Sequence, residues 1–78
     1  MSDALIGVFS EGLKLDAGGL SDDTSPENTS EWDSLASMTL VMLLEDTFDV
    51  RLSTKDILSM SSIGAARAVL QAKGVEGI

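Results

Sequence analysis

Hydrophobic residues recur three and four positions apart along most of this chain, which is the spacing of one face of an α-helix. The first such run contains Leu5, Ile6, Phe9 and Leu13. Ser2-Asp3 can cap its start, and we expect Gly18-Gly19 to end it. A polar segment over residues 20–33 follows, and loops of this length are usually functional or mobile.

Three further helical segments are predicted, at residues 34–48, 53–58 and 63–73. Ser53 can cap the short middle one, Ser61 or Ser62 can cap the last, and Gly74 is placed to stop it. No segment has the alternating pattern of a strand. We therefore expect an all-α fold, a small four-helix bundle of three main helices plus a short third helix. A long loop joins helices 1 and 2, and a chain of 78 residues predicts a single domain over 1–78.

The segment 34–48 presents two different faces on a helical wheel of about 100° per residue. The face expected to lie in the core contains Leu40, Val41, Leu44 and Phe48. The opposite face contains Leu35, Met38, Met42, Glu45, Asp46 and Asp49. We interpret this opposite face as a docking surface, because methionines adapt to several partners and acids at its rim would orient basic ones. Packing of Met38 and Met42 against a second helix is the alternative.

The tetrapeptide Trp32-Asp33-Ser34-Leu35 stands at the start of this helix. Asp33 or Ser34 can cap the helix, or Ser30 can do so with Asp33 three positions later. Trp32 can anchor the loop as a partly buried side chain, shield the junction or contact partners.

Composition removes several classes of function. The chain has 13 acids and 5 bases, for a formal net charge of −8, which disfavours nucleic acid and anionic membranes and favours basic protein surfaces. It has no Cys and no His, so thiol nucleophiles, imidazole bases and Cys/His metal sites are excluded. Neither a signal peptide nor a membrane-spanning run is visible, and we expect a cytoplasmic monomer.

Asp33-Ser34-Leu35, followed by Leu40-Val41-Met42-Leu43-Leu44-Glu45-Asp46-Thr47-Phe48-Asp49, resembles the acyl carrier proteins over nearly the whole chain. The resemblance implies that 4′-phosphopantetheine from coenzyme A is attached to Ser34 and carries acyl groups as thioesters between enzymes. We expect Asp33 to bind partners together with the docking face that begins at Leu35. The resemblance also implies an acyl pocket formed by Leu40, Leu44, Phe48 and Met60.

The chemistry of the residues agrees with a carrier that is not itself an enzyme. A chain without a thiol needs a prosthetic group to form thioesters. Ser34 has no neighbouring base, so a phosphopantetheinyl transferase must supply the base and the metal. The expected partners are this transferase and acyl-loading or acyl-transferring enzymes of a fatty-acid, polyketide or other specialised pathway.

Some positions differ from the carriers of general fatty-acid synthesis. Those carriers usually have acids where this chain has Ala36, Thr39, Ile57 and Leu58, with Lys55 among them. Glu31-Trp32 replaces the usual Gly-Ala pair, and the Gly-Gly-x-Ser of peptidyl carriers is absent. These differences predict a specialised, free-standing carrier.

Two other functions are considered. The first is an unmodified helical protein-interaction module. The second is a calcium-binding loop formed by Asp16, Asp22, Asp23 and Glu27. The acids of this loop lack the Asp-x-Asp-x-Asp-Gly spacing, and Pro26 interrupts it.

Overall fold

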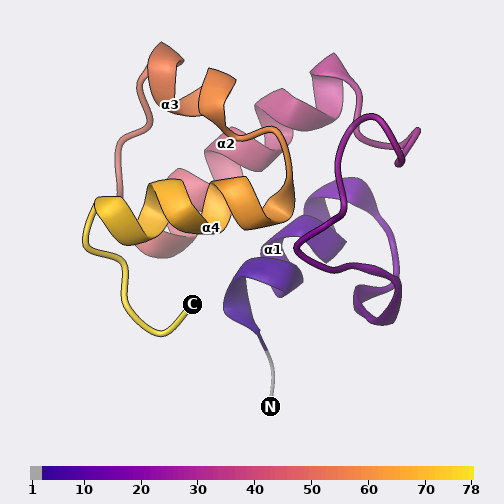
Figure 1. Ribbon diagram of the computed structural model, residues 1–78, viewed down its shortest axis with the longest axis horizontal. Coiled ribbons are helices and arrows are strands. Elements are labelled where there is room, and N and C mark those ends of the chain that lie inside the picture. The colour runs from indigo at the N-terminus through magenta and orange to yellow at the C-terminus, as the bar shows by residue number, and fades with distance from the viewer. Residues whose placement is uncertain (1–2) are drawn as a thin grey trace.

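A computed structural model describes residues 3–78, so the expected role of Ser2 in capping lies outside the described residues. The described chain is all-α, as predicted, and contains no strand (Figure 1). Its elements are α1 (Ala4–Leu13), a 3₁₀ helix η1 (Ala17–Gly19), α2 (Ser34–Phe48), α3 (Thr54–Ser59) and α4 (Ile63–Ala72). In Figure 1, α4 crosses in front of α2, and the long loop before α2 covers the side away from the C-terminus.

A capping side chain begins each α-helix. Asp33 is the cap of α2, since its Oδ1 accepts from the backbone N–H of Ala36 at 2.8 Å. This decides between the three candidates: Ser34 is the first helical residue, and Ser30 caps nothing. Ser53 and Ser62 cap α3 and α4 as predicted, and Asp3 caps α1.

The predicted end of the first helix at Gly18-Gly19 is wrong. The helix ends at Leu13, because Lys14 adopts a left-handed conformation with φ 58°. The N–H groups of Lys14 and Leu15 both donate to the carbonyl of Ser10, which satisfies the helix end. The two glycines lie instead in η1. At the other end of the chain, Gly74 has φ 92° just after α4, as expected.

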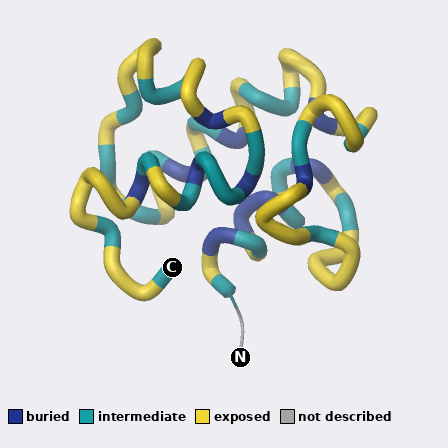
Figure 2. Tube along the Cα trace, in the orientation of Figure 1, coloured by how far each residue is buried: buried dark blue, intermediate teal, exposed yellow. Residues whose placement is uncertain are grey.

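The core lies where α1, α2, α4 and the end of the long loop meet (Figure 2). Its buried hydrophobic residues are Leu5, Val8, Phe9, Leu13, Trp32, Leu40, Leu44, Met60, Ile63, Ala66 and Leu70. Of the predicted core face of α2, Leu40 and Leu44 are buried, while Val41 and Phe48 are half-buried. Gly12 allows the close approach of α1 to α2, since a Cβ there would lie 2.5 Å from Leu40 Cδ2.

The long loop is attached to α4 by backbone and ionic contacts. The N–H groups of Ile63 and Gly64 donate to the carbonyls of Thr24 and Asp22 at 2.9 and 3.0 Å. Arg67 of α4 binds Asp22 at 2.9 Å and the α1 cap Asp3 at 2.7 Å. The hydrogen bond that Arg67 donates to Asp3 lowers the pKa of Asp3 below its ordinary value. The loop is therefore a structured arm that presents the start of α2.

Acid is expected to weaken the contact between α3 and α4. Asp56 pairs with Lys73 at 2.7 Å and accepts from the N–H of Ser53 at 2.9 Å, and these bonds lower the pKa of Asp56 from 3.8 to about 2. A carboxyl whose pKa is lower in the folded state stabilises the fold above pH 3.8, and this contribution is lost as the pH falls toward about 2.

The measurement is the urea midpoint between pH 5 and pH 2 for wild type, Asp56→Asn and the control Asp46→Asn, which removes an exposed acid of α2. The midpoint of Asp56→Asn should start lower and fall less across this range than that of the control. Parallel curves for the two variants would contradict the role given to Asp56.

Candidate functional site

Ser34 is exposed at the first position of α2, at the end of the long loop. The carboxylate of Asp33 occupies the N–H of Ala36, whereas the N–H groups of Ser34 and Leu35 have no acceptor within the helix because they lie in its first turn. A helix N-terminus of this kind stabilises an anion by about 0.3–1 kcal/mol. The hydroxyl of Ser34 is therefore accessible to a large reagent, and a phosphodiester on it would be favourably placed.

Trp32 anchors this junction as an almost entirely buried side chain. Its side chain is only 5% exposed and packs edge-on against Phe9, with ring centroids 5.1 Å apart. Its indole N–H donates to Ser37 Oγ at 3.1 Å, one turn into α2. Of the interpretations made from the sequence, the anchor is the one that these contacts support.

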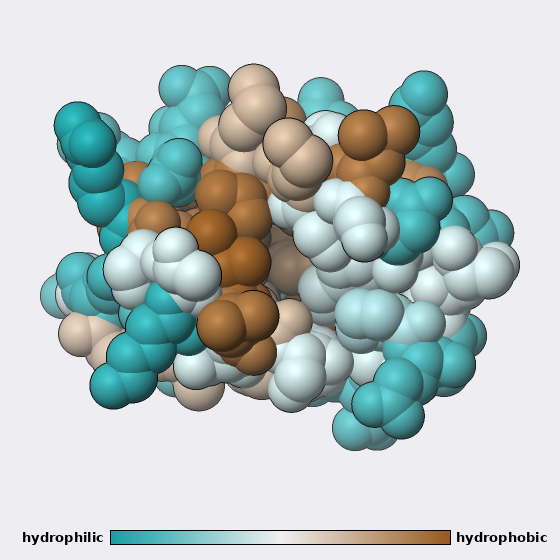
Figure 3. All heavy atoms as spheres, turned by 90° about the horizontal axis from the view of Figure 1, so that it is seen from above, coloured by the Kyte–Doolittle hydropathy of each residue, from teal (hydrophilic) through white to brown (hydrophobic). Residues whose placement is uncertain are grey.

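The outer face of α2 is exposed as the wheel predicts. Leu35, Met38 and Met42 are 75%, 66% and 70% exposed, so the alternative in which the two methionines pack against a second helix is wrong. Met38 and Met42 line an open groove of about 300 Å³ with Ser37, Val41 and Ile57 of α3. Seen from above, hydrophobic side chains gather beside a hollow (Figure 3). Leu58 of α3 is also exposed.

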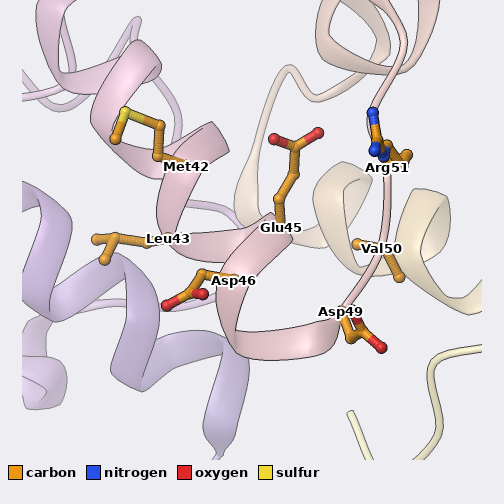
Figure 4. A pocket seen from close by; sticks show the side chains of 7 residues that line it. All are labelled: Met42, Leu43, Glu45, Asp46, Asp49, Val50 and Arg51. Carbon is orange, nitrogen blue, oxygen red and sulfur yellow. The ribbon is translucent and has the colours of Figure 1, made fainter.

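The three acids of this face have different surroundings (Figure 4). Asp46 and Asp49 are exposed, and Asp49 ends α2 in a left-handed conformation. Glu45 instead accepts the backbone N–H of Leu52 at 2.9 Å and so holds the link to α3. Together with Met42, Val50 and Arg51, these acids border a shallow depression of about 560 Å³.

The four residues expected to form an acyl pocket are only partly brought together. Leu40 and Met60 line a small interior cavity of about 30 Å³ between α2 and α3. Leu44 and Phe48 lie elsewhere on the core side of α2. The other lining residues, which the sequence reasoning did not assign to this pocket, are Phe9, Trp32, Ser37, Val41 and Ile57. Of these lining residues, only Trp32 could have been suspected from the sequence, because it is a large hydrophobic residue directly before Asp33-Ser34-Leu35.

Two of the four acids of the calcium-loop hypothesis have structural roles. Asp16 caps η1, and Asp22 pairs with Arg67. Among residues 3–78, no three acidic side chains are close enough to hold a metal ion. The same residues include no helix that is both long and apolar enough to cross a membrane.

Comparisons with known proteins agree on one family. The sequence model of the protein family described as "Phosphopantetheine attachment site" matches residues 3–70 of this chain. The curated acyl carrier protein of Prochlorococcus marinus (strain MIT 9515) is 30% identical over 66 residues, which cover 85% of this chain and 82% of that protein. The solution NMR structure of holo acyl carrier protein from Geobacter metallireducens has the same fold, with a TM-score of 0.80 at 24% identity over 97% of this chain and 91% of that one. The chain belongs to the acyl carrier protein family.

Membership of this family makes the chain a carrier and not a catalyst, with 4′-phosphopantetheine as its covalently bound group. The residues present fit such a group, because an exposed serine hydroxyl stands at the positive end of a 15-residue helix. When bound, the group supplies the thiol that this chain lacks.

Proposed function

We propose that Ser34 is the attachment site, and that the chain is a single cytoplasmic carrier domain that delivers acyl thioesters between enzymes. The observation that carries the proposal is an exposed serine in Asp33-Ser34-Leu35 at a helix N-terminus, within the segment that matches the family. The long loop supports this role because its middle is attached to α4 and its end, at Trp32, is attached to Ser37 of α2.

Attachment requires a second protein. Ser34 Oγ forms a bond to a phosphorus of coenzyme A, the phosphoanhydride bond breaks, and the adenosine bisphosphate leaves. The hydroxyl proton goes to a base of the phosphopantetheinyl transferase, since the chain has no histidine and Asp33 is engaged as the helix cap. The residues of the chain present the hydroxyl, stabilise the new negative charge and leave the outer face of α2 free for docking.

The test is the intact mass of the protein after incubation with coenzyme A, magnesium and a phosphopantetheinyl transferase. We expect a complete shift by one phosphopantetheine, located on the peptide that contains Ser34. An unchanged mass with several transferases would favour the alternative, an unmodified helical protein-interaction module. The exposed hydrophobic side chains of Leu35, Met38 and Met42 are also consistent with this alternative.

The partner surface is proposed to consist of Asp33, Leu35, Met38, Met42, Glu45, Asp46 and Asp49. Its hydrophobic part lies near Ser34, beside the helix cap Asp33, whereas its other two exposed acids, Asp46 and Asp49, lie at the far end of α2. The third helix adds Leu58, which is 80% exposed, in place of an acid. We infer that this carrier serves a specialised pathway whose enzymes have a hydrophobic and less basic docking patch.

General fatty-acid-synthesis enzymes should therefore use this carrier poorly. Each missing rim ion pair costs about 0.2–1 kcal/mol. Two or three together cost about 0.5–3 kcal/mol, up to about a hundredfold in affinity. Because rim charges act mainly on the association rate, the deficit should shrink as salt is added.

The measurement is a loading assay with one fatty-acid-synthesis acyltransferase, in which the holo protein and a housekeeping carrier are compared at low and high salt. Equal rates for the two carriers at both salt concentrations would refute the specialised role.

A further inference from the structure

Two side-chain hydrogen bonds close around Ser34, one inside the other. The inner bond joins the carboxylate of Asp33 to the backbone N–H of Ala36, at 2.8 Å. The outer bond runs from the indole N–H of Trp32 to Ser37 Oγ, at 3.1 Å. Ser34 lies between the two ends of both bonds. The residue that carries the candidate hydroxyl is therefore held by side chains that come before and after it in the chain.

The two bonds differ in how well they are shielded from water. The inner bond is exposed, so water can compete for both of its groups. The outer bond is partly buried, because Trp32 is only 5% exposed and its ring packs edge-on against Phe9 of α1. An indole N–H that loses its acceptor in such a place is costly, since water does not readily replace the partner. The outer bond is therefore the more persistent of the two.

The outer bond matters because the first turn of a helix has few bonds of its own. The N–H of Ser34 has no acceptor within α2, and helix ends fray. Met38 and Met42 of the docking face lie about one and two turns further along, where the helix is fully bonded. Fraying of the first turn would leave these methionines in place and displace Ser34 relative to them. A bond that spans the whole first turn opposes this displacement.

Trp32 also joins this turn to the rest of the protein. The ring that it contacts, Phe9, is fully buried, and the two ring centroids are 5.1 Å apart. The backbone N–H of Trp32 donates to the carbonyl of Thr29 at 3.0 Å, which closes a turn at the end of the long loop. The start of α2 is thus fixed to α1 and to the loop through one side chain.

We propose that Trp32 and Ser37 are positioning residues for the attachment of phosphopantetheine. Their hydrogen bond holds the first turn of α2, so that Ser34 Oγ keeps one place relative to the docking face. This inference rests on the proposed attachment at Ser34. Neither side chain supplies or takes a proton in the transfer, and both act through the backbone between them. Their effect falls on the rate of the chemical step, because a misplacement of the reacting atoms by about 1 Å can cost about a hundredfold in rate.

Ser37→Ala is the decisive variant. Alanine removes the acceptor of the outer bond, favours the helix and leaves Trp32 in the chain. Single turnovers of a phosphopantetheinyl transferase loaded with coenzyme A are measured against carrier concentration, so that product release does not enter. We expect the maximal rate to fall by roughly tenfold, and the half-saturating carrier concentration to stay unchanged because the docking face is intact. Ser37→Thr keeps a hydroxyl and should restore the rate.

Leu70→Val is the matched control for lost stability. It trims a fully buried side chain of α4 that takes part in neither bond, so its maximal rate should equal that of wild type wherever both are folded. Equal losses of rate in Leu70→Val and Ser37→Ala would reduce the effect to stability and overturn the inference. An unchanged maximal rate in Ser37→Ala would overturn it as well, even if the half-saturating concentration rose, since Ser37 would then be a docking residue.

The outer bond can also be observed without a transferase. Trp32 is the only tryptophan, so a ¹⁵N-labelled protein gives one indole N–H signal. Its exchange with water should be slow in wild type and Ser37→Thr and fast in Ser37→Ala. Fast exchange in wild type would contradict a persistent bond and overturn the inference.

Trp32→Phe and the double variant Trp32→Phe/Ser37→Ala complete a mutant cycle. If the two residues act through one bond, the double variant should react no more slowly than the slower single variant. Rate losses that multiply in the double variant would show that the two residues act separately. If Trp32→Phe does not fold, Ser37→Ala decides alone.

The intact mass of wild type separates a failure of this inference from a failure of the proposed function. A wild-type protein that gains no phosphopantetheine refutes the proposed attachment, and the positioning roles with it. Complete modification of wild type, together with an equal maximal rate for Ser37→Ala, refutes only the positioning roles.

Discussion

Ser34→Ala should abolish attachment of phosphopantetheine completely and leave the fold intact. Alanine has no oxygen to form the phosphoester, and the neighbouring cap Asp33 keeps its bond to the N–H of Ala36. Ser34 is the first helical residue and not the cap, so the usual cost of about 0.5–2 kcal/mol for a lost cap does not apply. Alanine also favours the helix slightly more than serine does.

Intact mass and circular dichroism check both halves of this expectation. Ser30→Ala is the matched control, because Ser30 is an exposed serine four residues earlier in the loop and should leave the modification complete. Asp33→Ala separates the two roles at this junction, since it removes the cap and keeps the nucleophile. Full modification of Ser34→Ala would show that another hydroxyl carries the group.

Leu44→Ala should destabilise the protein severely, whereas Met42→Ala, only two residues away, should not. Leu44 is fully buried, and truncating such a leucine costs about 2–5 kcal/mol. Met42 is 70% exposed, so its truncation should change the free energy of unfolding by no more than about 0.5 kcal/mol. At about 4–8 °C per kcal/mol for a domain of this size, the Leu44 variant should melt at least about 8 °C lower.

Urea and thermal unfolding of the two variants, side by side, measure this difference. In a binding assay with an acyltransferase, the order should reverse among folded proteins, since Met42→Ala removes part of the docking surface and Leu44 lies in the core. A loss of more than about 2 kcal/mol in Met42→Ala would mean that Met42 is a core residue.

The features that could be read from the sequence are those set by neighbouring residues. The start of α2 at Asp33-Ser34 and the caps at Ser53 and Ser62 depend on a side chain and an N–H two or three residues later, so local spacing reveals them. The exposed face of α2 follows from its periodicity in the same way. The motif around Ser34 pointed to the family, and the matched segment agrees.

The features that only the tertiary structure decided depend on which elements meet. Lys14 ends α1 in a left-handed conformation that lysine adopts at a cost, while the nearby glycine pair does not end the helix. Gly12 weakens a helix when judged locally, yet it permits the contact with Leu40 that brings α1 onto α2. Gly64 similarly leaves room for the carbonyl of Asp22 in the long loop, since a Cβ there would lie 3.1 Å from it.

The interior cavity is the clearest example of a feature that only the tertiary structure decided. Its lining comes from α1, the long loop, α2, α3 and the residue after α3, so no single helical wheel can list it. Periodicity shows which side of a helix is hydrophobic, but not what covers that side, because the covering residues lie far away in the chain. The sequence by itself indicated the four helical segments, candidate caps for them and the candidate serine, whereas the end of the first helix and the choice among the caps of α2 came from the structure. The packing of Trp32 between Phe9 and Ser37 was decided by the tertiary structure, because these residues come from the long loop, α1 and α2, and their contacts cannot be read from any one of these segments alone.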